Sequence, residues 1–281
     1  MIRAGGPRRI GSGRRAVNLS GTVDNDVISW AQRWRREAVR WAGDGADLLF
    51  PPGCRWCRDE GDFPAAGLCG SCLREFSRDQ PRCLRCGAGQ AQGTADCSRC
   101  RRDRVAWDGI LFLGGYGDAL REAILRIKRP GREDLARTLA EVLVDKHREV
   151  FEKTRFDGVV PVPMHWWRRA CRGTSAAEEI AGAIARRLRL RSVRLLVRAR
   201  ATRMQNELPA EDRAANVAGA FRVRRAVAGR RLLLVDDVVT TGATLAACCR
   251  ALRAAGAASV HGAALARADR LVETAEREPT S

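Results

Sequence analysis

Short apolar runs alternate with helical apolar periods from about residue 107 to residue 265. Continuous or alternating apolar runs bounded by Gly and Pro predict strands, whereas apolar positions three and four residues apart predict helices. We expect a strand or hairpin at 107–116, strands at 157–163, 192–197, 231–235 and 259–265, and helices at 119–128, 133–151, 176–188 and 243–255. This order predicts an α/β fold with a mostly parallel sheet and helices on both faces.

The N-terminal region has a different pattern. Residues 1–26 are rich in Gly and Arg and show no hydrophobic period, which predicts no fixed structure. The next residues carry an apolar stripe at helical spacing, made of Val27, Trp30, Trp34, Ala38 and Trp41. We interpret this stripe as an amphipathic helix, and such a helix packs more often against a neighbouring module than against lipid.

Eight of the eleven cysteines occur as four Cys-x-x-Cys pairs within one stretch. The pairs are Cys54/Cys57, Cys69/Cys72, Cys83/Cys86 and Cys97/Cys100. Two thiolates at this spacing reach one ion and two pairs complete a tetrahedral site, so we expect two structural Zn²⁺ ions. Sequential pairing closes the shorter loops, and cross-bracing is the alternative arrangement. A redox role would not require four copies, and an iron–sulfur cluster is the rival metal group.

These patterns divide the chain into five regions. We expect residues 1–26 to lack fixed structure, 27–50 to form a helix and connector, 51–103 to form a zinc module, 104–270 to form the α/β domain and 271–281 to be a flexible tail. The zinc module has little apolar content, so the metal has to replace a hydrophobic core.

Positive charge is concentrated in one part of the chain. The net charge is +18, and residues 182–231 contain 14 arginines against three acidic residues. A polyanionic partner is one interpretation. Coding bias toward arginine is the other, since only three of the 51 basic residues are lysines. No apolar run approaches the roughly 20 residues of a membrane span and none follows the basic N-terminus, so we expect a cytoplasmic protein.

A buried strand followed by two carboxylates carries the most specific chemistry. Leu232–Val235 is continuously apolar, as in a central strand buried on both faces. Open α/β sheets bind ligands beyond the carboxyl ends of their strands, where Asp236 and Asp237 stand. Adjacent carboxylates repel each other unless they meet hydroxyls or a hard cation, so we expect them to hold Mg²⁺ and ribose hydroxyls.

The turn after the carboxylates is suited to phosphate. Backbone N–H groups at the start of the following helix, threonine hydroxyls and a glycine that permits close approach together form a phosphate cradle. The expected binding residues are Val238, Val239, Thr240, Thr241, Gly242, Ala243 and Thr244. The alternative is that these residues merely end a strand and cap a helix.

The run from Leu232 to Thr244 resembles the signature with which type I phosphoribosyltransferases bind 5-phosphoribosyl 1-pyrophosphate (PRPP), across 13 positions. Residues 48–268 resemble the ComF family, also called ComF/GntX. That resemblance rests on Val160-Pro161-Val162-Pro163, Arg172-Gly173, Thr202 with Gln205, Arg213 with Asn216, and Gly219-Ala220-Phe221. The family usually continues Arg-Gly with an aromatic residue, Asn and Gln, and this chain instead has Thr174-Ser175-Ala176.

The resemblance implies a site for PRPP or a related ribose 5-phosphate ligand with Mg²⁺. Asp236 and Asp237 would then act in catalysis, and Arg172 and Lys128 would contact pyrophosphate. A transferase of this kind displaces pyrophosphate from the anomeric carbon of ribose with a nitrogen nucleophile. His165 lies in the implied pyrophosphate loop, although a histidine beside two tryptophans is more often a packing residue.

The resemblance also implies a setting in DNA uptake by transformable bacteria, with single-stranded DNA and DNA-uptake proteins as partners. The competing function is therefore a non-catalytic factor, associated with single-stranded DNA or sensing a nucleotide. Such a factor would use the zinc module and the arginine-rich surface of residues 182–231.

Overall fold

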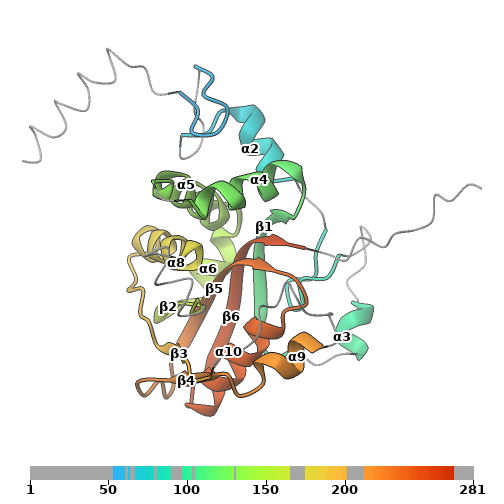
Figure 1. Ribbon diagram of the computed structural model, residues 1–281, viewed down its shortest axis with the longest axis vertical. Coiled ribbons are helices and arrows are strands. Elements are labelled where there is room, and N and C mark those ends of the chain that lie inside the picture. The colour runs from blue at the N-terminus through green and yellow to red at the C-terminus, as the bar shows by residue number, and fades with distance from the viewer. Residues whose placement is uncertain are drawn as a thin grey trace, which may run out of the picture. The chain divides into compact units, whose positions relative to one another are not determined.

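A parallel sheet lies at the centre of the described part of the chain in the computed structural model (Figure 1). The described residues are 53–60, 63, 67–78, 81–89, 97–102, 105–129, 131–164, 175–200 and 212–268. Within them the sheet has the order β1 (Gly109–Gly115), β6 (Ser259–Arg267), β5 (Arg231–Val239) and β2 (Gly158–Pro161). Every neighbouring pair is parallel, which confirms the predicted sheet.

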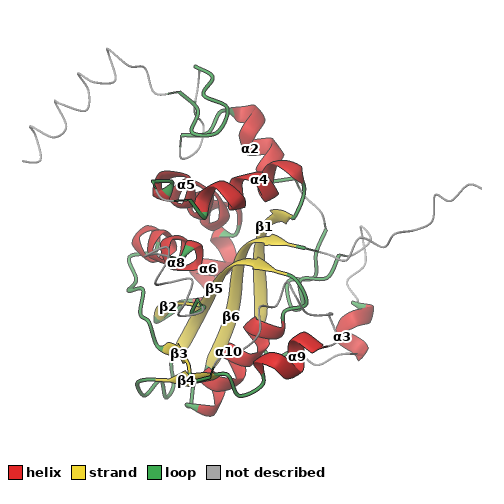
Figure 2. Cartoon of the chain, in the orientation of Figure 1, coloured by secondary structure: helices red, strands yellow, loops and turns green. Residues whose placement is uncertain are grey.

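Helices cover both faces of this sheet (Figure 2) because its central strand is apolar on both sides. Leu233 and Val235 of β5 join one core with helices α4, α5 and α8, and Leu232 and Leu234 join the other core with α10. The helices of the domain are α4 (Asp118–Ile127), α5 (Glu133–Lys146), α6 (Arg148–Thr154), α8 (Ala176–Arg187), α9 (Asp212–Val217) and α10 (Ala243–Ala254).

Three predicted elements differ from the structure by more than a shift at their ends or show an unexpected continuation. The helix expected at 133–151 is broken at His147 into α5 and α6. The strand expected at 192–197 is wrong as a single element: Ser192 bridges to β2, and β3 (Leu196–Arg198) pairs antiparallel with β4 (Phe221–Val223). The strand expected at 231–235 continues to Val239 along β6.

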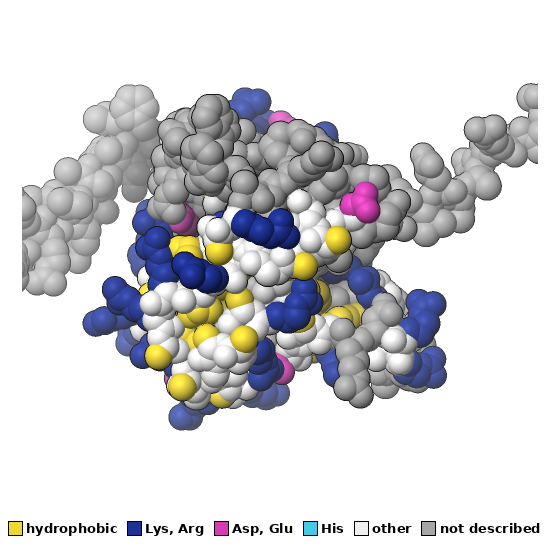
Figure 3. Space-filling model, turned by 60° about the horizontal axis from the view of Figure 1, so that its bottom comes forward, with side chains coloured by type: hydrophobic (Ala, Val, Ile, Leu, Met, Phe, Trp, Pro, Cys, Tyr) yellow, Lys and Arg dark blue, Asp and Glu magenta, His cyan; other side chains and the backbone are white. Residues whose placement is uncertain are grey.

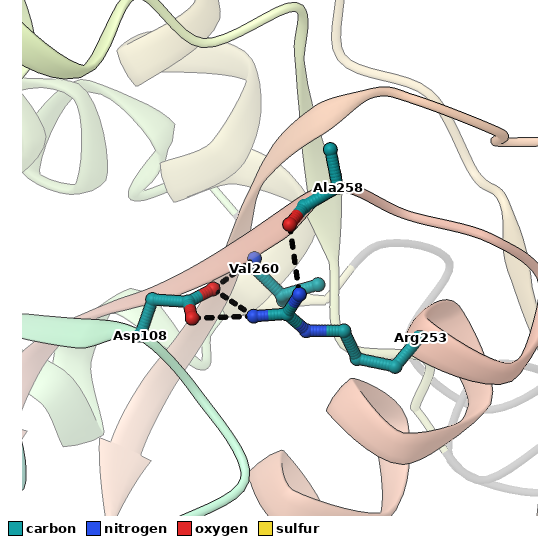
Figure 4. A network of polar contacts seen from close by, with 4 residues as sticks. All are labelled: Asp108, Arg253, Ala258 and Val260. Carbon is teal, nitrogen blue, oxygen red and sulfur yellow. Dashed lines mark hydrogen bonds and ion pairs between the residues drawn. The ribbon is translucent and has the colours of Figure 1, made fainter.

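A polar network joins the first residues of the sheet to the end of α10 (Figure 4). The Asp108 carboxylate accepts hydrogen bonds from the Arg253 guanidinium and from the Val260 backbone N–H, the latter at 2.7 Å. Arg253 also donates to the Ala258 carbonyl at 2.8 Å. One carboxylate thus ties together segments that are far apart in the sequence.

The cysteine-rich residues pack against this domain. They include the short helices α2 (Gly70–Phe76) and α3 (Ser98–Arg102). Leu68 and Phe76 are buried in the same core as α4 and α5. Residues 52–281 form one compact unit, and the tryptophan helix expected at 27–42 lies outside the described residues. In the described part of the chain, no helix combines the length and apolar character needed to cross a bilayer.

Candidate functional site

Asp236 and Asp237 lie in the second half of β5, which the sequence predicted to end before them. Asp236 is paired with Ala264 of β6, and the pairing continues to Val239 opposite Arg267. Both carboxyl side chains are partly buried. The strand therefore holds the two aspartates rigidly at its carboxyl end, the edge where α/β sheets bind ligands.

The two carboxyl groups differ in their electrostatic surroundings. Burial and the adjacent charge of Asp237 raise the pKa of Asp236 well above its usual range. Burial also acts to raise the pKa of Asp237, but the Lys128 ammonium outweighs that effect and holds the pKa below its usual value. The Lys128 Nζ atom lies 2.8 Å from Asp237 Oδ2. Asp236 thus retains its proton more readily, and Asp237 is held ionised.

Lys128 reaches this pair from the C-terminal end of α4. The sequence placed it as a pyrophosphate contact, and the structure places its ammonium on Asp237 with a third of the side chain exposed. Lys128 therefore belongs to the site at the end of β5. Its contact with pyrophosphate stays a prediction.

The turn after β5 places a glycine with a left-handed backbone directly before a helix. Gly242 has φ +80°, and α10 begins at the next residue. The Thr241 Oγ1 atom accepts a hydrogen bond from the Ala243 N–H at 3.3 Å. Thr240 is exposed, whereas Val239 is 2% exposed and its carbonyl accepts from Ala268 N–H. Of the predicted binding residues, those from Thr240 onward form the turn and the start of α10, and Val238 and Val239 belong to the strand.

Arg198 is a residue near the site that sequence reasoning missed. It lies on β3, with its Cζ atom 5.1 Å from the centre of the Phe221 ring. Burial lowers the pKa of Arg198, and electrostatic interactions with Cys248 and with Asp236 act against this shift. Because Arg198 lies in an arginine-rich segment, nothing in the sequence distinguishes it as a partly buried arginine near the carboxylate pair.

Several predicted site residues lie outside the described residues. They are Arg172 with Gly173, His165 of the implied pyrophosphate loop, and Thr202 with Gln205. The pyrophosphate contact expected of Arg172 stays a prediction.

The eight paired cysteines form two clusters, each made from sequential pairs. One contains Cys54, Cys57, Cys69 and Cys72, and the other contains Cys83, Cys86, Cys97 and Cys100. Within each cluster the Sγ atoms all lie within 4.8 Å of one another. Four sulfurs around one Zn²⁺ are separated by roughly 3.8 Å, given Zn–S bonds of about 2.3 Å. The clusters therefore fit structural zinc, in the sequential arrangement rather than the cross-braced one.

Each cluster also contains a thiol that ionises readily. The Ser71 hydroxyl is the main cause that lowers the pKa of Cys69 to about 6. In the other cluster, the backbone of Cys100 is the main cause that lowers the pKa of Cys97 to about 7. Thiolates are the form of cysteine that binds metal, so each cluster has a thiol ready to bind near neutral pH, whereas burial raises the pKa of Cys72 and of Cys86.

The arrangement agrees with two family models. A phosphoribosyl transferase domain matches residues 174–278, and a double zinc ribbon domain matches residues 45–101. The first includes the carboxylate pair and the turn after β5, and the second includes all eight paired cysteines.

Two relatives are similar over most of their length. The DNA utilization protein YhgH of Escherichia coli is 31% identical over 221 residues, which are 76% of this chain and 96% of that protein. Competence protein F of Haemophilus influenzae is 30% identical over 222 residues, with the same coverage. A solved structure of Leishmania donovani UMP synthase is 22% identical, with a TM-score of 0.30 over 47% of this chain and 22% of that one. A likeness at that level supports no conclusion about function.

Proposed function

Because this chain belongs to the ComF family and joins a double zinc ribbon to a phosphoribosyl transferase domain, we propose that it binds PRPP with Mg²⁺. The ribose and the metal would meet Asp236 and Asp237, and a phosphate would meet the turn from Thr240 to Thr244. The four Cys-x-x-Cys pairs are free thiols suited to metal, which favours a reducing compartment, so we place this function in the cytoplasm.

The observation that carries the proposal is the asymmetry of the carboxylate pair. Asp237 is held ionised by Lys128, and the pKa of Asp236 is raised. A divalent cation would favour release of the Asp236 proton and relieve the repulsion between the two carboxylates. A strand ending and a helix cap alone give no reason to keep two adjacent carboxyls partly buried.

The residues also suggest how this site would act in a transferase. Displacement of pyrophosphate by a nitrogen nucleophile places positive charge on the ribose ring, which the Asp236–Asp237 pair would stabilise. Mg²⁺, when bound, would neutralise the pyrophosphate that leaves. Backbone N–H groups of the turn before α10 would hold a phosphate in place. The acceptor is a nitrogen compound, which this site does not identify further.

Calorimetry with PRPP, with and without Mg²⁺, tests the proposal. We expect binding that requires Mg²⁺ and is lost in the Asp236→Asn/Asp237→Asn variant. The zinc content and thermal unfolding of the variant provide the check that it is folded. Absence of PRPP binding by the folded, zinc-loaded wild type would refute the proposal.

A second candidate function, association with single-stranded DNA, is favoured by the surface charge. Figure 3 shows a face on which Lys and Arg, in dark blue, are spread over the described surface with little acidic magenta. The segment around β4 contributes five exposed arginines: Arg222, Arg224, Arg225, Arg230 and Arg231. The names of the two relatives refer to competence and to DNA utilization.

A salt titration separates the two functions. Binding of an oligo(dT) through these arginines should weaken with a log–log slope of about −0.7 for each phosphate contacted. The Arg222→Gln/Arg224→Gln/Arg225→Gln variant should reduce both affinity and slope, and Asp236→Asn/Asp237→Asn should change neither. Weak binding with no salt dependence would exclude this candidate.

A further inference from the structure

Trp107 lies between the second cysteine cluster and the turn after β5. It precedes β1, and only 6% of its surface is exposed. Its indole Nε1–H donates a hydrogen bond of 2.8 Å to the carbonyl of Arg85. Arg85 stands between Cys83 and Cys86, so the acceptor belongs to the backbone of a Cys-x-x-Cys turn. The position of this indole is therefore set by the shape of that turn.

The opposite end of the indole supports the turn after β5, residues 240–244, which we call the phosphate turn. A Cβ atom built on Gly242 would lie 2.9 Å from the Trp107 Cη2 atom, closer than carbon atoms approach without displacement. Gly242 has φ +80°, a conformation that residues other than glycine rarely adopt. Gly242, the most constrained residue of the turn, thus packs directly against the Trp107 ring. It lies immediately before α10.

The second cluster is also attached to the strand that follows Trp107. The Ile110 N–H donates to the Leu84 carbonyl at 2.8 Å. A Cβ on Gly87 would collide with the Phe112 ring, so this glycine packs directly against β1. These contacts hold Leu84 and Gly87 against β1, and Arg85 lies between them in the turn that joins Cys83 to Cys86.

The first cluster packs elsewhere. Arg55 donates to the Thr138 Oγ1 atom of α5 at 3.0 Å, and the Arg126 guanidinium of α4 lies 4.2 Å from the centre of the Trp56 ring. The first cluster therefore packs against the core of α4, α5 and α8, whereas Trp107 belongs to the core of α10. The chain therefore provides a matched control, a second cluster of the same chemistry that packs against the other core.

We propose that Trp107 is a positioning residue through which the second cysteine cluster, but not the first, controls the geometry of the phosphate turn. Without metal the four thiols are no longer held together, and the Arg85 carbonyl loses its fixed position. The indole then loses its acceptor, and Gly242 loses the surface that supports it. The fraction of molecules in which the phosphate turn has its binding conformation falls accordingly. The importance of this turn for PRPP rests on the proposed function.

Hydrogen–deuterium exchange tests the coupling without any ligand. We expect Trp107→Phe, which removes the indole donor, to speed exchange in a peptide covering residues 240–245 by about tenfold, the factor expected for one buried hydrogen bond. Cys100→Ser should have the same effect, and Cys57→Ser should not. Both cysteine variants should lose one zinc equivalent, and peptides from the centre of β5 should stay protected.

Two results would overturn the inference. One is unchanged exchange of residues 240–245 in both Trp107→Phe and Cys100→Ser. The other is an equal increase in Cys57→Ser. If Trp107→Phe does not fold, the comparison between the two cysteine variants still decides.

PRPP calorimetry on the same proteins separates this inference from the proposed function. We expect Mg²⁺-dependent binding to weaken about tenfold in Trp107→Phe and Cys100→Ser and to persist in Cys57→Ser. Equal affinity in all four proteins would contradict the coupling and leave the PRPP site intact. A wild type that binds no PRPP would refute the proposed function, and the exchange data alone would then decide on the coupling.

Discussion

At the scale of single residues, Asp236 and Asp237 show how neighbours of the same type acquire opposite properties. Each carboxylate accepts a hydrogen bond from the backbone N–H of the next residue: Asp236 Oδ1 from Asp237 and Asp237 Oδ1 from Val238, both at 2.9 Å. Asp237 forms an ion pair with the Lys128 ammonium. This difference predicts that the two aspartates contribute to stability with opposite signs.

In Mg²⁺-free buffer near pH 7.5 we expect Asp236→Asn to raise the free energy of unfolding by about 1 kcal/mol and Asp237→Asn to lower it by about 1 kcal/mol. The folded pKa of Asp236 is raised, so its stabilising contribution to the free energy of unfolding is present at low pH. This contribution is lost as pH rises through that pKa. The folded pKa of Asp237 is lowered, so its contribution is present above the unfolded pKa and is lost as pH falls.

Urea unfolding at several pH values measures both effects. The gain from Asp236→Asn should grow as pH rises, and the loss from Asp237→Asn should shrink below about pH 4, near the unfolded pKa of aspartate. Changes of the same sign in the two variants at pH 7.5 would contradict this assignment.

Gly242 gives a second prediction at this scale. Gly242→Ala should lower the free energy of unfolding by about 3 kcal/mol, because it adds a clash with Trp107 to the cost of a left-handed backbone. Gly131 is the control, since it has φ +76° and no atom within 4 Å of its Cβ position. Gly131→Ala should cost only about 1–2 kcal/mol. Equal losses in the two variants, measured by urea unfolding, would exclude the contact with the indole.

At the scale of elements, local patterns predicted which segments are strands and helices but not where tertiary contacts change them. The apolar period continues through His147, yet the helix breaks there, where the ring Nε2 lies 2.8 Å from the Phe112 carbonyl of β1 and Lys146 donates to the next carbonyl. Strand β5 continues through two aspartates because β6 pairs with it as far as Arg267. Both effects depend on partners that are distant in the sequence.

The same reason explains which parts of the candidate site the sequence revealed. The carboxylate pair, the turn and the cysteine pairs are contiguous motifs, so spacing alone identified them. The sequential joining of the cysteine clusters, the ammonium of Lys128 on Asp237 and the indole of Trp107 under Gly242 depend on how separate elements pack.

The Asp108–Arg253 network gives a prediction about how elements are joined. Both side chains are more than a third exposed, so we expect a coupling free energy of about 1 kcal/mol from the double-mutant cycle Asp108→Ala, Arg253→Ala. The exposed pair Glu149–Lys153 on α6 is the control and should give about 0.3 kcal/mol. Urea unfolding measures both cycles. A coupling no larger than that of the control would show that the network does not join β1 to α10.

At the scale of the whole molecule, the two cysteine clusters attach to different cores of one domain. Leu68 and Phe76 extend the core of α4 and α5, and the second cluster reaches the core of α10 through Trp107. The sequence predicted a zinc module at 51–103 in which metal replaces a hydrophobic core. Packing of the described cysteine-rich residues also joins metal binding to the stability of the domain on both faces of the sheet.

This arrangement predicts how zinc is distributed over the chain. The wild type should bind two equivalents. Cys57→Ser/Cys69→Ser removes two ligands from one sequential cluster, so it should keep one equivalent, whereas Cys57→Ser/Cys83→Ser damages both clusters and should keep none. Zinc content measured by mass spectrometry after dialysis checks these values. Cross-bracing of the first pair with the third would reverse the two results, because Cys57 and Cys83 would then share an ion, and the separate action of the two clusters on the two cores would have to be abandoned.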